Sequence, residues 1–163
     1  SCLGVFAFRL GDPKRKLFTW WDLTVGKLKR ESFYVIQEKY TGKKTKNKPP
    51  LFTKLELDKY TVNAGGKLNI TINARDREND PLTYAIKIWR LRKHNPNRHI
   101  PEIMDVDKKF NVPKFVFKAP NISGLYKLIV YVYDDHGNIG VRNVTFKVEP
   151  HGQTPVAPNV SVR

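Results

Sequence analysis

Two β-rich runs separated by a short polar turn constrain the fold of this chain more than any other feature. Residues 124–133 and 139–148 are rich in β-branched and aromatic residues, and the turn between them reads Asp134-Asp135-His136-Gly137-Asn138. This pattern predicts a β-hairpin. Tyr126 follows the glycine that opens the first run, which is where the last hairpin of a two-sheet sandwich carries a corner tyrosine.

Further strands are predicted upstream, at the spacing of an all-β sandwich. With the hairpin, the candidates are Leu51–Leu57, Lys67–Ala74, Leu82–Leu91, Lys114–Lys118, Leu125–Tyr133 and Ile139–Val148. Turn signals rich in Asn, Asp, Gly and Pro separate them. The expected core faces are Leu68/Ile70/Ile72, Leu82/Tyr84/Ile86/Ile88, Phe115/Phe117, Tyr126/Leu128/Val130/Val132 and Val144/Phe146/Val148. We therefore expect a mainly β fold, with an immunoglobulin-like (Ig-like) antiparallel β-sandwich over residues 49–150.

A strand–loop–helix pattern occupies residues 1–48. Residues 1–10 are almost continuously apolar, as in a strand that is buried on both faces, and a basic loop follows. A helix is expected over residues 29–40, with Gly42 placed to end it. Its apolar face is expected to consist of Phe33, Ile36 and Tyr40. One such unit cannot bury its own strand, so it requires a partner surface.

Two segments read as connections rather than as packed elements. Residues 43–50 are charged and end in two prolines, which predicts a linker into the sandwich. Residues 151–163 contain Pro and Gly breaks and little apolar bulk, which predicts a flexible tail. Cys2 is the single cysteine, so no internal disulfide can form.

Composition excludes several classes of protein. The chain has 30 Lys and Arg residues against 15 Asp and Glu residues, a net charge of +15 that is spread along the sequence. Without a zinc spacing, a helix-turn-helix or an RNA-binding signature, this charge does not indicate a specific nucleic-acid partner. No apolar run approaches the roughly 20 residues that span a membrane. The first residues are not those of a secretory leader, so we expect a removed leader or a fragment.

Four Asn-x-Ser/Thr sequons indicate a secreted or cell-surface glycoprotein. The acceptor residues are Asn69, Asn121, Asn143 and Asn159. Asn69 falls on the polar face of its predicted strand, and Asn121 and Asn159 fall in turn or tail sequence. The alternative is chance occurrence in an Asn-rich chain.

Acidic residues cluster in two predicted turns. The residues are Asp76, Glu78 and Asp80 in the first turn and Asp134 and Asp135 in the second. If the two turns share one end of the sandwich, their oxygen atoms suit Ca²⁺, the one cofactor that the sequence indicates. The alternative is turn chemistry, because Asp and Asn bond their own backbone at bends. No nucleophile motif or phosphate-binding Gly loop occurs, so catalysis is not expected.

Adjacent tryptophans are the candidate carbohydrate-binding residues. Trp20 and Trp21 follow the apolar run and the basic loop, and they could form a stacking platform for a sugar ring. The alternative is that both pack between helix and sheet. Trp89 alternates with Ile86 and Ile88, so it should lie on the opposite face of its strand.

The order of several segments carries a family resemblance. The segments are Cys2–Phe8, Thr19-Trp20-Trp21-Asp22-Leu23, Tyr40-Thr41-Gly42-Lys43, Asp76–Tyr84, Lys118-Ala119-Pro120 and Gly124–Gly137. Residues 2–149 resemble the C-terminal region of a family-2-like (β/α)8-barrel glycoside hydrolase. In that family the last barrel strand, a Thr-Trp-aromatic loop and a final helix lead into an Ig-like or PKD-like module.

The resemblance implies a sugar-contacting role for Trp20 and Trp21. It has two departures. Arg9-Leu10-Gly11 replaces the usual Trp-Gly after the barrel strand. The catalytic carboxylates of the family lie on earlier barrel strands, and glycoside hydrolysis needs two such groups held across the bond. This chain therefore lacks the catalytic pair.

Two functions from different classes follow from these observations. The first is an extracellular, non-catalytic accessory module of a glycoside hydrolase, acting as a spacer or support with weak polysaccharide contact. Its partner would be the rest of the enzyme or another copy of the chain. The second is a secreted structural or adhesive cell-surface subunit, whose apolar residues 1–10 complete a neighbour's sheet by strand addition.

Overall fold

The strands of the computed structural model follow the hydrophobic alternation of the sequence closely. The structure describes residues 22–91, 102–104, 109–110 and 114–151. Its elements are β1 (Thr24–Val25), β2 (Leu28–Lys29), α1 (Glu31–Thr41), β3 (Leu51–Leu57), β4 (Thr61–Asn63), β5 (Lys67–Arg75), β6 (Thr83–Leu91), β7 (Glu102–Met104), β8 (Lys109–Phe110), β9 (Lys114–Lys118), β10 (Gly124–Tyr133) and β11 (Ile139–Glu149). The mainly β fold class and the six predicted strands are confirmed.

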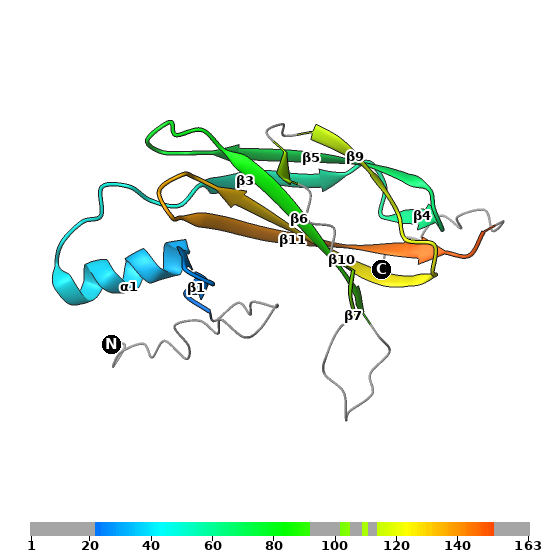
Figure 1. Cartoon of the computed structure of the whole chain (residues 1–163), viewed down its shortest axis with the longest axis horizontal. Helices are drawn as coiled ribbons and strands as arrows, with labels where there is room; N and C mark the ends of the chain where they lie inside the picture. Colours follow the sequence, from blue (N-terminus) through cyan, green and yellow to red (C-terminus); the bar gives the residue numbers. More distant parts are fainter. Residues whose placement is uncertain (1–21, 92–101, 105–108, 111–113, 152–163) are drawn as a thin grey trace, which may run out of the picture.

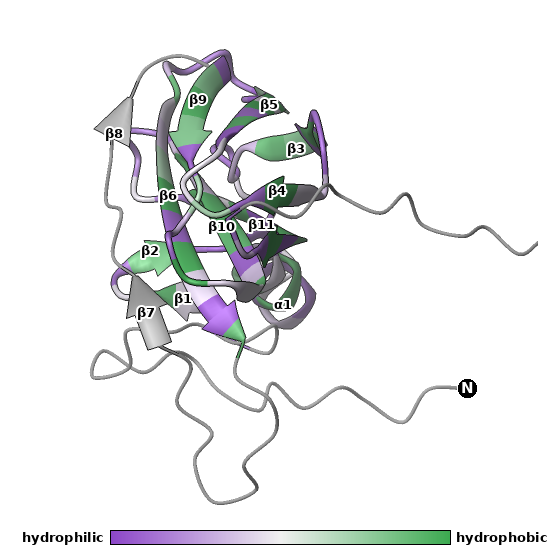
Figure 2. Ribbon diagram, turned by 90° about the vertical axis from the view of Figure 1, so that its right-hand side faces the viewer, coloured by the Kyte–Doolittle hydropathy of each residue, from purple (hydrophilic) through white to green (hydrophobic). Residues whose placement is uncertain are grey.

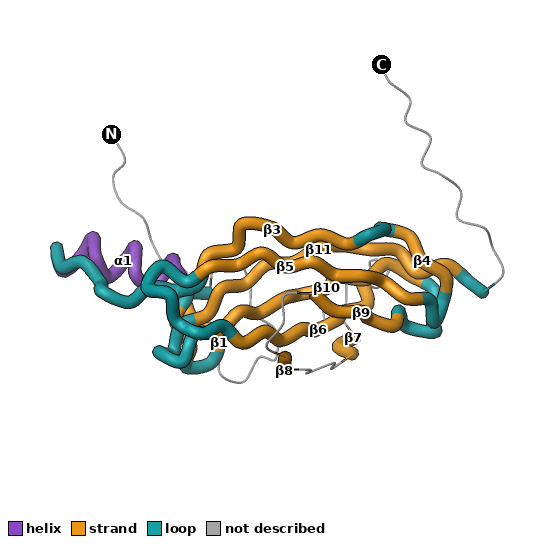
Figure 3. The backbone as a smooth tube through the Cα atoms, turned by 90° about the horizontal axis from the view of Figure 1, so that it is seen from above, coloured by secondary structure: helices purple, strands orange, loops and turns teal. Residues whose placement is uncertain are grey.

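Two larger sheets form the sandwich (Figures 1 and 3). One has the order β3-β5-β9, and the other has the order β4-β11-β10-β6-β7, with β8 also paired to β6. Strands β10 and β11 pair without interruption from Gly124↔Val148 to Tyr133↔Ile139, so the predicted hairpin is confirmed. Strand β3 pairs with β5 in the smaller sheet, whereas β4 pairs parallel with β11 in the larger one. The chain therefore crosses from one sheet to the other between β3 and β4.

The main hydrophobic core lies between the two sheets, and Figure 2 shows hydrophobic residues along the strands of both sheets. Tyr126 is fully buried and stacks on Phe146 at 5.6 Å between ring centroids. Its hydroxyl group donates a hydrogen bond of 2.7 Å to the carbonyl oxygen of Ile122, which makes Tyr126 the corner tyrosine that the sequence predicts. Every predicted core position is buried in this cluster or packs against it; the partly buried ones are Leu82, Phe115 and Val144.

A second, smaller cluster covers the outer face of the larger sheet. Trp89 is 9% exposed and belongs to it, on the side opposite Ile86 and Ile88, as the alternation predicts. Val25 and Leu28 of the β1–β2 hairpin pack against the same cluster. The outer face is therefore partly covered by the segment that precedes α1.

Helix α1 lies beyond one end of the sandwich, at the end where β10 turns into β11 (Figures 1 and 3). The helix ends as predicted, because Gly42 adopts φ 67° and its N–H group donates to the carbonyl oxygen of Glu38. The buried residue of the helix is Tyr34, whereas Tyr40 is 81% exposed. Placing Tyr40 on the buried face was therefore wrong, because the sandwich contacts a neighbouring stripe of the helix.

Three expectations fall outside the described residues. They are the apolar strand at residues 1–10, most of the tail at residues 151–163, and the burial of that strand against a partner surface. The domain division at residues 1–48 and 49–150 stays a prediction.

Candidate functional site

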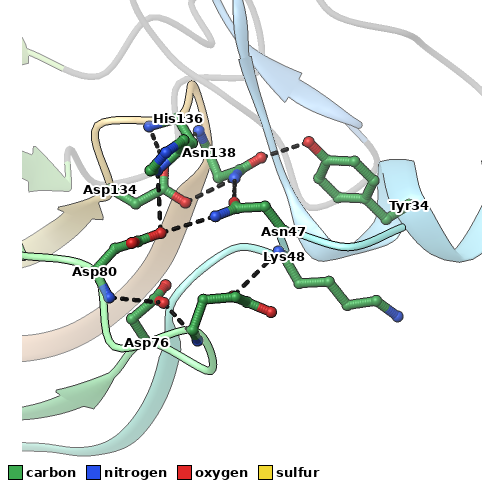
Figure 4. Close-up of polar contacts among 9 residues, drawn as sticks. Tyr34, Asn47, Lys48, Asp76, Asp80, Asp134, His136 and Asn138 are labelled. Atoms are coloured by element: carbon green, nitrogen blue, oxygen red, sulfur yellow. Dashed lines mark hydrogen bonds and ion pairs between the residues drawn. The ribbon is translucent and has the colours of Figure 1, made fainter. Parts of the chain in front are cut away.

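Two acidic turns meet at the end of the sandwich that faces α1. Asp76 Oδ1 accepts hydrogen bonds from the N–H groups of Glu78 and Asp80, at 2.8 and 3.1 Å. Asp134 Oδ1 does the same for His136 and Asn138, both at 2.9 Å. Each aspartate thus fixes its own turn, which is the turn chemistry that the sequence indicates. The two turns share one end of the sandwich (Figure 4), which the sequence left open.

Asn138 connects the second turn to the N-terminal segment. Its side chain is 1% exposed, and its Nδ2 donates to Asp134 Oδ2 at 2.6 Å and to Asn47 Oδ1 at 2.5 Å. Its Oδ1 accepts a hydrogen bond of 2.5 Å from the hydroxyl group of Tyr34. One buried amide therefore joins the helix, the linker and the sandwich. Because a buried amide is costly without partners, this arrangement fixes all three relative to one another.

The linker closes the same network from the other side. Asn47 Nδ2 donates to Asp80 Oδ2 at 2.8 Å, and His136 Nδ1 lies 3.0 Å from the same oxygen. Pro49 and Pro50, which follow, are buried. Residues 47–50 are thus packed against the sandwich instead of extending into solvent.

A second set of contacts holds the linker to the end of α1. Glu38 Oε1 accepts a hydrogen bond of 2.8 Å from the N–H group of Thr45 and lies 2.9 Å from Lys48 Nζ. The Thr45 N–H group, followed by Lys48, lowers the pKa of Glu38 below its ordinary value. The carboxylate is therefore ionised at neutral pH and bridges the helix to the linker.

Burial has the opposite effect on the tyrosine of the network. Desolvation, followed by the charge of Asp134, raises the pKa of Tyr34 above its ordinary value. The hydroxyl group therefore keeps its proton and remains a donor to Asn138 at physiological pH.

The predicted calcium ligands divide into two groups. Asp80 and Asp134 offer oxygen atoms that lie, together with a ring nitrogen of His136, within 4.8 Å of one another. Asp76 is not within this distance of all three; it is 7% exposed, and among the described residues its Oδ2 has no hydrogen-bond partner. In the second group, Glu78 and Asp135 are exposed, and Glu78 accepts a long hydrogen bond of 3.4 Å from the N–H group of Lys48. Calcium binding itself stays a prediction.

The remaining predicted sites are on the surface or outside the described residues. Asn69, Asn121 and Asn143 are exposed. Trp20, Trp21 and Asn159 lie outside the described residues. Within the described part of the chain, no helix has the length and apolar character to cross a bilayer.

Four residues of the network were not predicted as functional residues: Tyr34, Asn47, His136 and Asn138. His136 and Asn138 lie in the turn that the sequence predicts, so their place in the hairpin could be predicted, whereas their contacts with other segments could not. Asn47 gave no signal, because it stands in a Lys-rich linker. Tyr34 gave none, because the helical periodicity indicated a different face.

A groove of about 380 Å³ lies next to the network. It runs between the start of α1, the two linker prolines and the start of β11. Gly140 forms part of its floor, where a Cβ atom would lie 2.6 Å from the carbonyl oxygen of Pro50 and 3.3 Å from the ring of Phe52. The absence of a side chain at Gly140 is therefore what allows the linker to approach β11.

Comparisons with known proteins give no family and several distantly similar structures. No protein-family model matches the sequence, and no curated protein matches it either. The structure has distant similarity to the PKD1 domain of Vibrio anguillarum Epp, with a TM-score of 0.42 and 16% identity over 64% of this chain and 99% of that one. It is also similar to the PKD domain of an M14-like peptidase from Thermoplasmatales archaeon SCGC AB-540-F20, with a TM-score of 0.43 and 17% identity over 63% of this chain and 97% of that one.

A third similar structure concerns carbohydrate-binding modules from the β-sandwich superfamily. Its TM-score is 0.44, with 17% identity over 66% of this chain and 37% of that one. These likenesses concern the fold alone. The sheet order and the core between the sheets define the chain as a β-sandwich, and these proteins are its distant structural neighbours.

Proposed function

We propose that this chain is an extracellular, non-catalytic accessory module that acts as a spacer and support for a glycoside hydrolase. The observation that carries the proposal is the buried contact of Tyr34 with Asn138, at 2.5 Å. It holds the segment that precedes the sandwich in a fixed position. A support must hold the preceding part of the protein in a fixed orientation relative to the sandwich, which a flexible linker does not do.

The packing of the linker supports this role. Asn47 bonds to both acidic turns through Asp80 and Asn138, and Pro49 and Pro50 are buried. Because proline fixes its own φ angle, the buried pair adds stiffness at the entry to the sandwich.

The state of the carboxylates supports a non-catalytic role. Asp134 is 4% exposed and both of its oxygens accept hydrogen bonds from the protein. Asp80 Oδ2 is engaged by Asn47 and His136. Among the described residues, these carboxylates serve the junction, and a hydrolase would need two that face a bound sugar.

The surface sequons support an extracellular location. Asn69, Asn121 and Asn143 are all exposed, so a glycan on any of them would extend into solvent. Weak polysaccharide contact through Trp20 and Trp21 is the finer part of the proposal. Affinity electrophoresis in gels that contain a soluble polysaccharide tests this contact. The Trp20→Ala and Trp21→Ala variants should each migrate faster than the wild type. If both variants are retarded as much as the wild type, the two tryptophans do not form a sugar-binding platform.

Backbone ¹⁵N relaxation tests the support role directly. The backbone N–H groups of residues 45–48 should show heteronuclear NOE values equal to those of the strands, and values of a flexible linker would contradict the proposal. Light scattering after size exclusion should give a monomer. A ladder of assemblies would instead favour the structural subunit that polymerises by strand addition.

Genomic sequence upstream of the Ser1 codon tests the enzyme association. A (β/α)8 domain with two suitably placed carboxylates supports it, and an unrelated reading frame contradicts it.

A further inference from the structure

We propose that the solvent-facing side of the smaller sheet binds an acidic polysaccharide through the unpaired lysines Lys67, Lys114 and Lys118. The choice of a polysaccharide rests on the proposed extracellular function. The attraction for a polyanion rests on the charges of this face alone.

The smaller sheet has one face in the core and one face in solvent. In β5, the buried residues Leu68, Ile70 and Ile72 alternate with polar residues that face outward. Helix α1 lies beyond the end of the sandwich and leaves the outer face uncovered (Figure 1). A polymer therefore has free access to it.

Positive charge predominates on this outer face. The outward positions of the three strands carry the cations Lys54, Lys67, Arg75, Lys114 and Lys118 and the anion Glu56. Glu56 is neutralised within its own strand, because its Oε2 lies 2.8 Å from Lys54 Nζ. Asp58, which follows β3, accepts hydrogen bonds of 2.9 and 2.7 Å from the N–H group and Nδ2 of Asn69. The face keeps an excess of cations after both carboxylates are counted.

Three of these lysines have no anionic partner in the described part of the chain. Lys67, Lys114 and Lys118 are all exposed, and none of them forms an ion pair with a described residue. The register of β5 and β9 places Lys67 directly opposite Lys118. Like charges at directly opposed positions are destabilising. An anionic ligand that contacts both ammonium groups would remove this repulsion.

The residues among the lysines favour a polysaccharide over a nucleic acid. The aromatic residues of the three strands, Phe52, Phe115 and Phe117, belong to the core side. The outer face thus lacks the aromatic platforms on which single-stranded nucleic acids stack. Asn69 and Thr71 lie in the same ladder as the lysines, and amide and hydroxyl groups suit sugar hydroxyls. Lysine supplies compact charges for carboxylate or sulfate groups without the planar fork of arginine.

Asn69 also links this face to the predicted glycosylation. An N-glycan on Asn69 would stand over the same face and block access to the lysines. Binding is therefore expected of chains in which Asn69 carries no glycan, and the test uses protein from a host that adds none.

Calorimetric titration of the whole chain tests the proposal. Polygalacturonate or dextran sulfate should bind, and the logarithm of the affinity should fall linearly with the logarithm of the salt concentration. The combined variant Lys67→Gln/Lys114→Gln/Lys118→Gln should bind at least roughly tenfold more weakly at low salt, with a salt slope smaller by about two to three. Uncharged dextran is the reference for contacts that do not depend on charge, such as those proposed for Trp20 and Trp21.

The matched control is Lys43→Gln/Lys44→Gln/Lys46→Gln. It removes the same net charge from three exposed residues of the linker, and it should bind the acidic polymer nearly as the wild type does. Equal weakening in the two triple variants would overturn the site, because it would show attraction by net charge alone. Absence of binding to both acidic polymers would also overturn it. Tighter binding of single-stranded or duplex DNA at the same salt concentration would overturn the choice of ligand.

Amide chemical shifts of the wild type keep the proposal testable if the first triple variant does not fold. Addition of the acidic polymer should shift the amides of β5 and β9, and shifts centred on residues 43–46 would overturn the site. Failure of the proposed function is distinguishable, because a flexible junction or an unrelated upstream reading frame would appear without any ligand.

Discussion

The hydroxyl group of Tyr34 and the side-chain carbonyl of Asn138 lie 2.5 Å apart, although 104 positions separate them in the sequence. Asn138 is 1% exposed and Tyr34 is 6% exposed, so water does not substitute for either partner. This pair connects the helix that precedes the sandwich to the closing hairpin. The position of the helix is thus determined by the same turn that carries Asp134.

Tyr34→Phe tests the importance of this contact. The substitution keeps the ring and leaves Asn138 Oδ1 buried without its donor, so the free energy of unfolding should fall by about 1–3 kcal/mol. Tyr40→Phe is the matched control on the same helix, because Tyr40 is 81% exposed, and it should cause no change in urea denaturation. Equal stability of the two variants would contradict a structural role for the pair.

Tyr126→Phe tests the corner of the sandwich. The variant loses the hydrogen bond to Ile122 but keeps the stacking on Phe146. We expect a loss of about 0.5–1.5 kcal/mol in the free energy of unfolding, measured by urea denaturation. Tyr60→Phe, at a position that is 53% exposed, is the control. A loss of the same size in the control would show that the corner hydrogen bond contributes nothing specific.

Gly140→Ala tests the approach of the linker to β11. A Cβ atom at this position would lie 2.6 Å from the carbonyl oxygen of Pro50, so the linker backbone or the strand must move. Such overpacking costs about 1–3 kcal/mol. The thermal midpoint should fall, and the heteronuclear NOE values of residues 45–48 should fall with it. A variant as stable and as rigid as the wild type would show that the linker does not depend on this contact.

Glu38→Gln tests the bridge between α1 and the linker through its pH dependence. The pKa of Glu38 is lowered in the folded state by the Thr45 N–H group and by Lys48. Its contribution to stability is therefore present above the pKa of the unfolded chain and is lost as pH falls through the folded pKa. Wild type should be more stable than the variant at pH 7, and the difference should shrink in acid.

Urea midpoints between pH 7 and pH 3 measure this effect. Glu56→Gln removes an exposed carboxylate of the same size and controls for the change in net charge. A difference between wild type and Glu38→Gln that is constant with pH would contradict the bridge.

Much of the fold could be predicted from local pattern. Strands of five or more residues are long enough to show either an apolar–polar alternation, as in β5, or a run rich in β-branched and aromatic residues, as in β10. Strands β3, β5, β6, β9, β10 and β11 were therefore all predicted. Strands β1, β2 and β4 have two or three residues and no measurable period. They form because neighbouring segments supply hydrogen-bond partners, which no local pattern indicates.

The candidate site was predicted only where its chemistry is local. Asp76 and Asp134 fix turns within four residues of themselves, and turn sequence indicates such contacts. The contact of Asn47 with Asn138 spans 91 positions. A lysine-rich stretch that reads as a solvated linker becomes a packed junction because two distant turns meet it, and this convergence is a property of the three-dimensional fold.

Electron–electron double resonance between spin labels at Lys39 and Lys67 tests the fixed junction most directly. Both side chains are exposed, one on α1 and the other at the start of β5, so the labels should not disturb the fold. The fixed junction predicts one narrow distance distribution in the wild type and a broader one in Tyr34→Phe. A broad distribution in the wild type, unchanged by the substitution, would contradict it.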